Sequence, residues 1–275
     1  MGNRRTRWSW LGRIGYREAT ALQLALRARV QRGEGEEHLL LLEHPHVYTL
    51  GRNATAADVV ASRAWLAREG VEVCETDRGG QVTYHGPGQL VGYPILDLNP
   101  DRRDVRRYVA DLSAALVATL AGYGIAARAA ARSAETGVWV EERKIASIGI
   151  HLSRWVTTHG FALNVTPDLS FFGGIVPCGM PGVRMTSIAA EGAGEPDLAE
   201  VARRFLVPFA AQFDREPVLI VSVVAEMIAG SEGIGYYIMS MQYALRASDM
   251  YAAIFLLAAT GYVLKEDVRD SDGKI

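Results

Sequence analysis

Cysteine and lysine are both scarce in this 275-residue chain. The 2 cysteines, Cys74 and Cys178, exclude a secreted scaffold stapled by several disulfides, and a reducing compartment is the simpler assumption. Of the 29 Lys and Arg residues 26 are Arg, and the first 264 positions contain a single lysine, Lys144. Arginine cannot be deprotonated in a protein, which leaves Lys144 and the histidines as the basic groups that can carry a proton.

A strong net charge and an apolar leader are also absent from the sequence. The formal net charge is -2, which argues against a nucleic-acid protein because phosphate binding needs a concentrated positive field. The start, Met-Gly-Asn-Arg-Arg-Thr-Arg-Trp, has no apolar stretch of the kind that precedes a secretory cleavage site. We therefore expect the catalytic part to be cytoplasmic. With 49% hydrophobic residues, the chain can bury one large α/β domain plus a small appendage.

Hydrophobic periodicity predicts an α/β (α+β) fold built on a mixed sheet. Helical spacing of apolar residues predicts helices over 16–30, 57–69, 104–123 and 198–213. Alternating apolar residues predict strands over 71–76, 93–98, 137–140, 144–152 and 155–165, and 36–51 reads as a buried strand followed by a loop. The regular strand-helix repeat of a doubly wound fold is missing. We expect a hairpin-rich, largely antiparallel sheet with flanking helices, ending in a linker at 214–217.

The two cysteines lie in contrasting surroundings. Cys178 lies within GGIVPCGMPG (173–182), a run of turn-forming residues that presents it on a loop, as a reactive cysteine requires. Position alone leaves catalysis and a tolerated loop cysteine both open. Cys74 lies in the alternating segment VEVCET (71–76), where a small buried apolar residue fits, and we interpret it as structural.

A catalytic thiol needs a basic or positive neighbour, because its ordinary pKa of about 8.5 leaves it mostly protonated at neutral pH. Lys144 opens the segment KIASIGIHL, where small residues suit a side chain pointing into a tight site. The alternative is a solvated strand end that follows the charged residues 141–143. The absence of other lysines from this region favours the functional interpretation.

A glycine-rich stretch runs from Arg78 to Gly92, RGGQVTYHGPGQLVG, and includes His85 and Gln89. Glycines let the backbone approach a ligand closely, and free amides can stabilise an oxyanion. Two successive hairpin turns are the structural alternative. The stretch lacks the spacings of phosphate-binding loops, so it does not indicate a phosphate site. His44 and His46 have no third ligand at a characteristic spacing, and we do not expect a metal site.

Several of these motifs, in this order, resemble the lipoyl(octanoyl) transferase family over residues ~10–217. The resemblance rests on LLLLEHPHVYTLGR (39–52), RGGQVTYHGPGQLVGYPI (78–95), KIASIGI and HGFALNV (within 144–165), and IVPCGM (175–180). It implies the fold of the biotin and lipoate protein ligases. It also implies that Cys178 is the acyl-thioester nucleophile and that Lys144 is its dyad partner. The implied substrate-binding residues are Arg78, Gly79, Gly80, Gln81, Val82, Thr83, Tyr84, His85, Ser147, Ile148, Gly149, Gly160, Phe161 and Ala162.

The same resemblance implies the reaction and its partners. The donor is octanoyl-acyl carrier protein, and the acceptor is a lysine on the lipoyl domain of a 2-oxoacid dehydrogenase or on the glycine cleavage H protein. This is protein lipoylation, a part of lipoate biosynthesis. Neither ATP nor a metal is expected as a cofactor, since a thioester is already activated.

The C-terminal part of the chain departs from this pattern. We expect a catalytic domain over 1–216 and a short apolar helical extension with a polar tail over 217–275. The extension resembles the C-terminal end of an ABC-importer permease subunit, through AEMIAG, GIGYYI and DMYAAIFLLAATGY. Its apolar runs of 13 to 14 residues fall short of the roughly 30 Å hydrocarbon core at about 1.5 Å per residue. We expect it to dock on the enzyme, on a second copy or on a membrane surface.

Three other functions compete with octanoyl transfer. An ATP-dependent lipoate or biotin ligase shares the implied fold but needs no nucleophilic cysteine, which Cys178 disfavours. A fragment of a membrane transport subunit would give the extension the main role. A Cys-His hydrolase would use His85 or His159 as its base and release free fatty acid.

Overall fold

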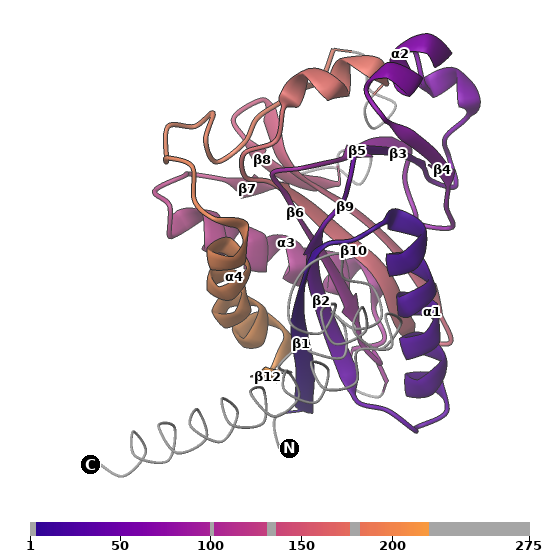
Figure 1. Cartoon of the computed structure of the whole chain (residues 1–275). Helices are drawn as coiled ribbons and strands as arrows, with labels where there is room; N and C mark the ends of the chain where they lie inside the picture. The colour runs from indigo at the N-terminus through magenta and orange to yellow at the C-terminus, as the bar shows by residue number, and fades with distance from the viewer. Residues whose placement is uncertain (1–3, 100–101, 131–135, 177–181, 220–275) are drawn as a thin grey trace, which may run out of the picture. The chain divides into compact units, whose positions relative to one another are not determined.

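The protein is described from a computed structural model that covers residues 4–99, 102–130, 136–176 and 182–219 (Figure 1). In these residues a nine-stranded mixed sheet has the order β12-β1-β2-β6-β10-β9-β8-β7, and β11 pairs with β9. Its strands are β1 (Arg4–Arg13), β2 (Glu37–Glu43), β6 (Gln89–Ile95), β7 (Arg128–Ala129), β8 (Gly137–Val140), β9 (Arg143–Ser153), β10 (Val156–Asn164), β11 (Arg184–Met185) and β12 (Arg215–Leu219). The pairs β12-β1, β1-β2 and β9-β11 are parallel, and the others are antiparallel.

A second, three-stranded sheet in the order β4-β3-β5 lies beside the main one. Its strands are β3 (Val47–Leu50), β4 (Glu72–Glu75) and β5 (Val82–His85). The helices are α1 (Tyr16–Gln31), α2 (Arg63–Arg68), α3 (Val105–Ala121) and α4 (Leu198–Phe213), with 3₁₀ turns η1 (Ala56–Asp58) and η3 (Leu169–Gly174). Figure 1 shows α1 on one face of the main sheet, and α3 and α4 on the other. Among the described residues, no helix is both long and apolar enough to span a bilayer.

The main core lies between the sheet and the pair formed by α3 and α4. Its buried members include Leu112 and Leu116 of α3, Phe205 of α4, and Ile148 and Phe161 of the sheet. The rings of Phe161 and Phe205 lie 4.7 Å apart. This packing fixes one face of β9 and β10, the two strands that carry most of the predicted site residues.

Short polar signals set the ends of these elements. Asp104 caps α3 by accepting hydrogen bonds from the amides of Arg106 at 2.8 Å and Arg107 at 3.0 Å. The β9-β10 hairpin turns at Arg154 and Trp155, whose φ angles of 47° and 65° are both positive. Two successive positive φ angles match the right-handed twist of the paired strands, so the hairpin closes tightly.

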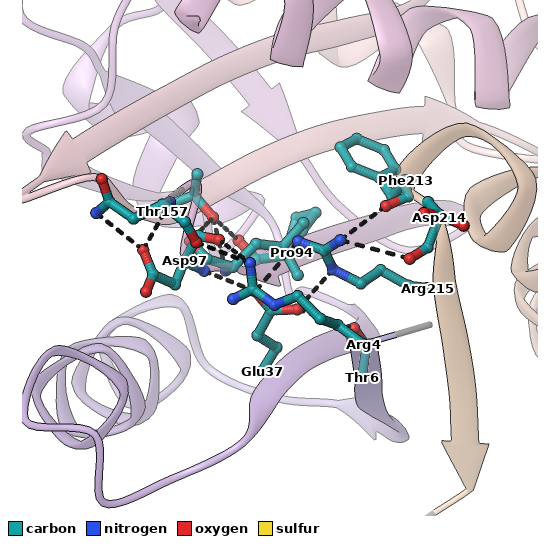
Figure 2. Close-up of polar contacts among 11 residues, drawn as sticks. Arg4, Thr6, Glu37, Pro94, Asp97, Thr157, Phe213, Asp214 and Arg215 are labelled. Carbon is teal, nitrogen blue, oxygen red and sulfur yellow. Dashed lines mark hydrogen bonds and ion pairs between the residues drawn. The ribbon is translucent and has the colours of Figure 1, made fainter. Parts of the chain in front are cut away.

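A buried ion-pair cluster ties the first and last strands of the main sheet together (Figure 2). Glu37 of β2 accepts hydrogen bonds from Arg4 of β1 at 2.6 Å and from Arg215 of β12 at 2.7 Å. The amide of Asp97 donates a further bond to Glu37 at 2.9 Å. Because both arginines and the amide point at one carboxylate, three sheet strands and the segment after β6 are held at one point.

Most of the predicted elements are confirmed. Helices over 16–30, 104–123 and 198–213 correspond to α1, α3 and α4, and strands over 137–140, 144–152 and 155–165 correspond to β8, β9 and β10. The mixed, largely antiparallel sheet is confirmed as well.

Three predictions were wrong. The helix over 57–69 is a 3₁₀ turn followed, after a bridge from Val59 to Ile175, by the short helix α2. The loop expected after the first buried strand is β3, and the linker at 214–217 is largely β12, which continues the main sheet beside β1. The apolar extension lies outside the described residues beyond Leu219.

Candidate active site

A cavity of about 570 Å³ opens between the main sheet, the glycine-rich stretch and the N-terminal ends of α1 and α3. This volume lies in the range of about 300–1,000 Å³ that is usual for small-molecule sites. Residues of the main sheet, the glycine-rich stretch and two helices line it: Tyr16, Asn53, Arg78, Gly79, Gly80, Gln81, Val82, Thr83, His85, Tyr93, Val105, Val109, Thr136, Lys144, Ser147, Ile148, Gly149, Ile150, His159, Gly160, Phe161 and Ala162. Aliphatic and aromatic side chains make up much of this wall, which suits an apolar chain.

Lys144 lies in the cavity wall near the start of β9. Only 2% of the residue is exposed, so the solvated strand end considered as an alternative does not occur. Its Nζ lies 5.5 Å from the centroid of the Trp139 ring on the paired strand β8. A Cβ atom on Gly137 would lie 2.5 Å from Cε of Lys144, so the glycine leaves the room through which the lysine side chain passes.

Cys178 falls within 177–181, outside the described residues, and the described chain on either side of it is anchored by backbone hydrogen bonds. On one side, the amide of Val176 donates to the carbonyl of Asp58 at 2.8 Å. On the other side, β11 pairs with β9 so that Met185 lies opposite Lys144. The segment that contains Cys178 therefore leads directly into the strand that borders Lys144.

Arg78 and its glycines form the part of the wall opposite β9. The guanidinium of Arg78 donates to the carbonyl of Thr49 at 2.6 Å and to its hydroxyl at 2.8 Å, and it is buried. A Cβ on Gly149 of β9 would lie 2.9 Å from the carbonyl oxygen of Gly79. The glycine-rich stretch can approach β9 this closely only because residue 149 has no side chain.

Three buried histidines lie in or just behind the cavity wall, and each is held by hydrogen bonds. His44 Nδ1 lies 2.7 Å from the carbonyl of Ile14, and its Nε2 lies 2.8 Å from the Tyr93 hydroxyl. His159 Nε2 lies 2.8 Å from Asp77 Oδ1, and His85 Nδ1 lies 2.8 Å from Gln89 Oε1.

Burial keeps these imidazoles neutral. It lowers the pKa of His44 to about 4, and it lowers the pKa of His85 well below the usual value. Burial also lowers the pKa of His159, although the neighbouring Asp77 carboxylate acts in the opposite direction. The site therefore contains neutral hydrogen-bonding imidazoles at physiological pH.

The structure brings most of the predicted site residues together. Lys144 and every predicted substrate-binding residue except Tyr84 line the one cavity. Tyr84 is fully buried beneath the smaller sheet, where its ring stacks on Phe171 at 5.2 Å and its hydroxyl bonds to His46 at 2.9 Å. The contiguous assignment of 78–85 therefore includes one residue, Tyr84, that belongs to the core of the smaller sheet and not to the cavity wall.

Some lining residues were not predicted from the sequence, among them Tyr16, Tyr93 and Thr136. Tyr93 follows the glycine-rich stretch directly and lies within the motif RGGQVTYHGPGQLVGYPI (78–95), which was the available signal. Tyr16 and Thr136 come from separate elements and gave none.

Cys74, by contrast, is confirmed as a buried structural residue of β4. Burial raises the pKa of its thiol to about 11, with the neighbouring Glu72 acting in the same direction, so it stays protonated. In the part of the chain that the structure describes, no group of three or more His, Cys, Asp or Glu side chains is placed to hold a metal ion.

Comparison with known proteins identifies close relatives. The profile of the lipoyl protein ligase A/B catalytic domain matches residues 15–210. The octanoyltransferase of Solibacter usitatus is 55% identical over 206 residues, which cover 75% of this chain and 92% of that protein. The octanoyltransferase of Chloroflexus aurantiacus is 49% identical over 211 residues, covering 76% and 94% of the two chains.

Solved structures agree at the level of the fold. A lipoate-protein ligase A bound with ATP superposes with a TM-score of 0.62 at 17% identity, covering 80% of this chain and 90% of that one. A bi-partite lipoate protein ligase from Thermoplasma acidophilum gives a TM-score of 0.61 at 18% identity, covering 80% and 88%. The relatives found by sequence also identify the family, because their identity to this chain is much higher. The chain belongs to the lipoyl protein ligase A/B catalytic domain family and, within it, to the octanoyltransferases, and it is an acyltransferase.

Proposed function

We propose that the enzyme transfers an octanoyl group from acyl carrier protein to a lysine of a lipoyl domain, through a thioester on Cys178, as a step of lipoate biosynthesis. The observation that carries the proposal is the position of Lys144. The lone lysine of the first 264 residues is buried in the wall of an apolar cavity, on the strand that pairs with the segment following Cys178. A basic group placed there can activate a thiol and move its proton.

In the first half-reaction, the Cys178 thiolate attacks the carbonyl carbon of the donor thioester. A bond forms between that carbon and the Cys178 sulfur, and the bond to the carrier sulfur breaks. The departing carrier thiolate takes a proton from the Lys144 ammonium. The products are octanoyl-Cys178, a neutral Lys144 and the free carrier thiol.

In the second half-reaction, the acceptor lysine arrives as an ammonium ion and gives one proton to neutral Lys144. The resulting amine attacks the octanoyl-Cys178 carbonyl, the bond to Cys178 breaks, the nitrogen releases its second proton to a base or to water, and an amide forms. Lys144 and Cys178 return to their charged starting forms. No ATP is consumed, because the donor thioester already provides the driving force.

The cavity accounts for the choice of a medium-length acyl chain. Val82, Ile148 and Phe161 line it, and burying about seven methylenes contributes on the order of 5 kcal/mol at roughly 0.8 kcal/mol each. This contribution is available to donor and transition state alike, so it favours binding of an octanoyl chain over shorter chains.

Intact mass spectrometry after incubation with octanoyl-acyl carrier protein tests the proposal. We expect one octanoyl adduct on the parent chain, none on Cys178→Ser, and loading slowed at least about 100-fold in Lys144→Arg, since arginine keeps the charge but cannot exchange the proton. Adduct formation that required ATP would indicate a ligase. Release of free octanoate in preference to transfer would indicate a hydrolase.

Two matched controls separate the roles of these residues from general damage. Cys74→Ser removes the other cysteine, which is buried in β4, and we expect it to load at the parental rate. Lys265→Arg makes the same exchange as Lys144→Arg at a lysine outside the described residues, and we expect no effect on loading.

A further inference from the structure

A chain of buried amides leads from His85 to the strand that carries Lys144. Gln89 Oε1 lies 2.8 Å from His85 Nδ1, and Gln89 Nε2 donates to the carbonyl of Tyr84 at 3.2 Å and to Asn164 Oδ1 at 2.9 Å. Asn164 Nδ2 donates to the carbonyl of Thr186 at 2.9 Å, and the amide of Thr186 donates to the carbonyl of Lys144 at 2.9 Å. Gln89 and Asn164 are each only 1% exposed.

The two backbone carbonyls fix the direction of every bond in this chain. A carbonyl can only accept, so Asn164 must turn its NH₂ group to Thr186, and Gln89 must turn its NH₂ group to Tyr84. Both amides then have a single orientation, since reversing either one would set two oxygens against each other. Gln89 Oε1 therefore faces His85, and His85 Nδ1 must carry the hydrogen.

The same arrangement leaves the other ring nitrogen of His85 for a ligand. The imidazole plane is held by Tyr16, which stacks on it at 6.1 Å and 14°, and by the edge of His44 at 5.8 Å. His85 lines the cavity, and with Nδ1 engaged by Gln89, Nε2 has no partner among the described residues. Nε2 lacks a hydrogen in this tautomer, so it offers a lone pair to the cavity.

The proposed reaction needs such a group. An acceptor ammonium loses two protons on becoming an amide nitrogen, one before attack and one as the carbon–nitrogen bond forms. Lys144 is neutral after the first half-reaction, so it can accept only one of these two protons. The second proton comes from a nitrogen that has become positively charged on attack, which makes it a far stronger acid than a free ammonium, and a weakly basic imidazole is sufficient to accept it.

We propose that His85 Nε2 accepts a hydrogen bond from the attacking acceptor amine and receives the second proton, and that Gln89 and Asn164 are positioning residues that hold His85 in the required tautomer. The inference rests on the proposed function. In balanced form, the amine lone pair bonds to the octanoyl carbon and the sulfur of Cys178 leaves with its bonding electrons. The proton moves from nitrogen to His85 Nε2 and then to water in the cavity.

Separate measurement of the two half-reactions tests the role of His85. In His85→Asn, the side-chain NH₂ can still donate to Gln89, but nothing replaces Nε2. We expect this variant to transfer the octanoyl group to a lipoyl-domain protein about 100-fold more slowly than the parent, with any slowing of loading from octanoyl-acyl carrier protein at least about tenfold smaller. A small thiol such as 2-mercaptoethanol attacks as its thiolate and loses no proton after attack, so it serves as the control nucleophile and should discharge both acyl-enzymes at similar rates.

Gln89 variants test the positioning role. Gln89→Met removes the acceptor at Nδ1 with little change of volume, and we expect transfer to fall about tenfold while loading is kept. Nitrogen NMR of histidine-labelled protein reads the tautomer without any substrate: the parent should show hydrogen on Nδ1 of His85, and Gln89→Met a mixture of tautomers.

The outcomes separate this inference from the proposed function. If the parent fails to form the Cys178 adduct, both are overturned. If the parent loads normally and His85→Asn transfers at the parental rate, or loses loading and transfer in parallel, this inference alone is overturned. A parent spectrum with hydrogen on Nε2 of His85 would also overturn it.

Discussion

The buried Glu37 cluster predicts a large and specific loss of stability when its charge is removed. Glu37 is 6% exposed at its side chain and its partner Arg215 is 1% exposed, with a separation of 2.7 Å. In Glu37→Gln, the shape is kept but two arginines, Arg4 and Arg215, lose their shared counter-ion. Removing one partner of a buried ion pair costs about 3–5 kcal/mol, because the remaining charge stays buried without compensation.

The neighbouring residue supplies the matched control. Glu36, which directly precedes β2, pairs with Arg7 of β1, but their side chains are 42% and 48% exposed. An exposed pair contributes about 0–1 kcal/mol, so Glu36→Gln should lower the free energy of unfolding by less than about 1 kcal/mol.

Urea denaturation, followed by tryptophan fluorescence and analysed by linear extrapolation, measures both variants under one condition. We expect Glu37→Gln to be less stable than Glu36→Gln. If the two variants were equally stable, burial would not be the reason why the Glu37 ion pairs stabilise the fold. The double variant Glu37→Leu with Arg215→Leu should lose less free energy of unfolding than the two single variants lose in sum. In each single variant the remaining partner is a buried charge without its counter-ion, whereas the double variant removes both charges of the pair.

Two further predictions concern the site. Burial lowers the pKa of His44 to about 4 in the folded protein against about 6.5 in an unfolded chain, so the unfolded state binds more protons between these values. His44 should by itself lower the free energy of unfolding by up to about 3 kcal/mol as the pH drops from 6.5 to 4, in addition to the fall from His85 and His159. The urea midpoint of His44→Asn should therefore fall less steeply than that of the parent. Gly137 has a φ of 144° and faces Lys144 closely, so Gly137→Ala should slow loading of Cys178 at least about tenfold. The control is Gly124→Ala, because Gly124 also has a positive φ, 73°, but a Cβ there would meet nothing within 4 Å. This variant should leave the loading rate per folded molecule unchanged.

Much of the candidate site could be predicted from the sequence because its residues lie in continuous motifs. Lys144 was recognisable as the lone lysine of its region, and the segments 78–85, 147–149 and 160–162 each belong to a strand or loop that borders the cavity. Tyr84 shows the limit of assigning a whole motif to a site, because its ring packs on Phe171 in the core of the smaller sheet and does not reach the cavity. Tyr16 joins the site only through tertiary packing, which no local pattern encodes.

The elements that were missed have a common physical cause. The first strand, β1, reads RRTRWSWLGR, and its inward positions include Thr6 and Ser9, which are small and polar. Both are buried, and the Thr6 hydroxyl donates to Glu37, so the usual apolar alternation of a strand is absent. Likewise, Asp214 and Arg215 look like a solvated linker until Glu37 is known to be the counter-ion of Arg215. Tertiary charge pairing replaced hydrophobic patterning at this edge of the sheet.

The pairing of β1 with β12 has a consequence for how the chain is made. Arg4 of β1 lies opposite Arg215 of β12. During synthesis β1 therefore leaves the ribosome first and cannot pair with β12 until nearly the whole described chain has been translated. During that interval Glu37 has only Arg4 beside it, and one edge of β1 stays open to other nascent chains. A shortened gene product ending after Pro217 would lose Val218 and Leu219, which lie opposite Arg7 and Trp8, and would leave part of that edge open permanently.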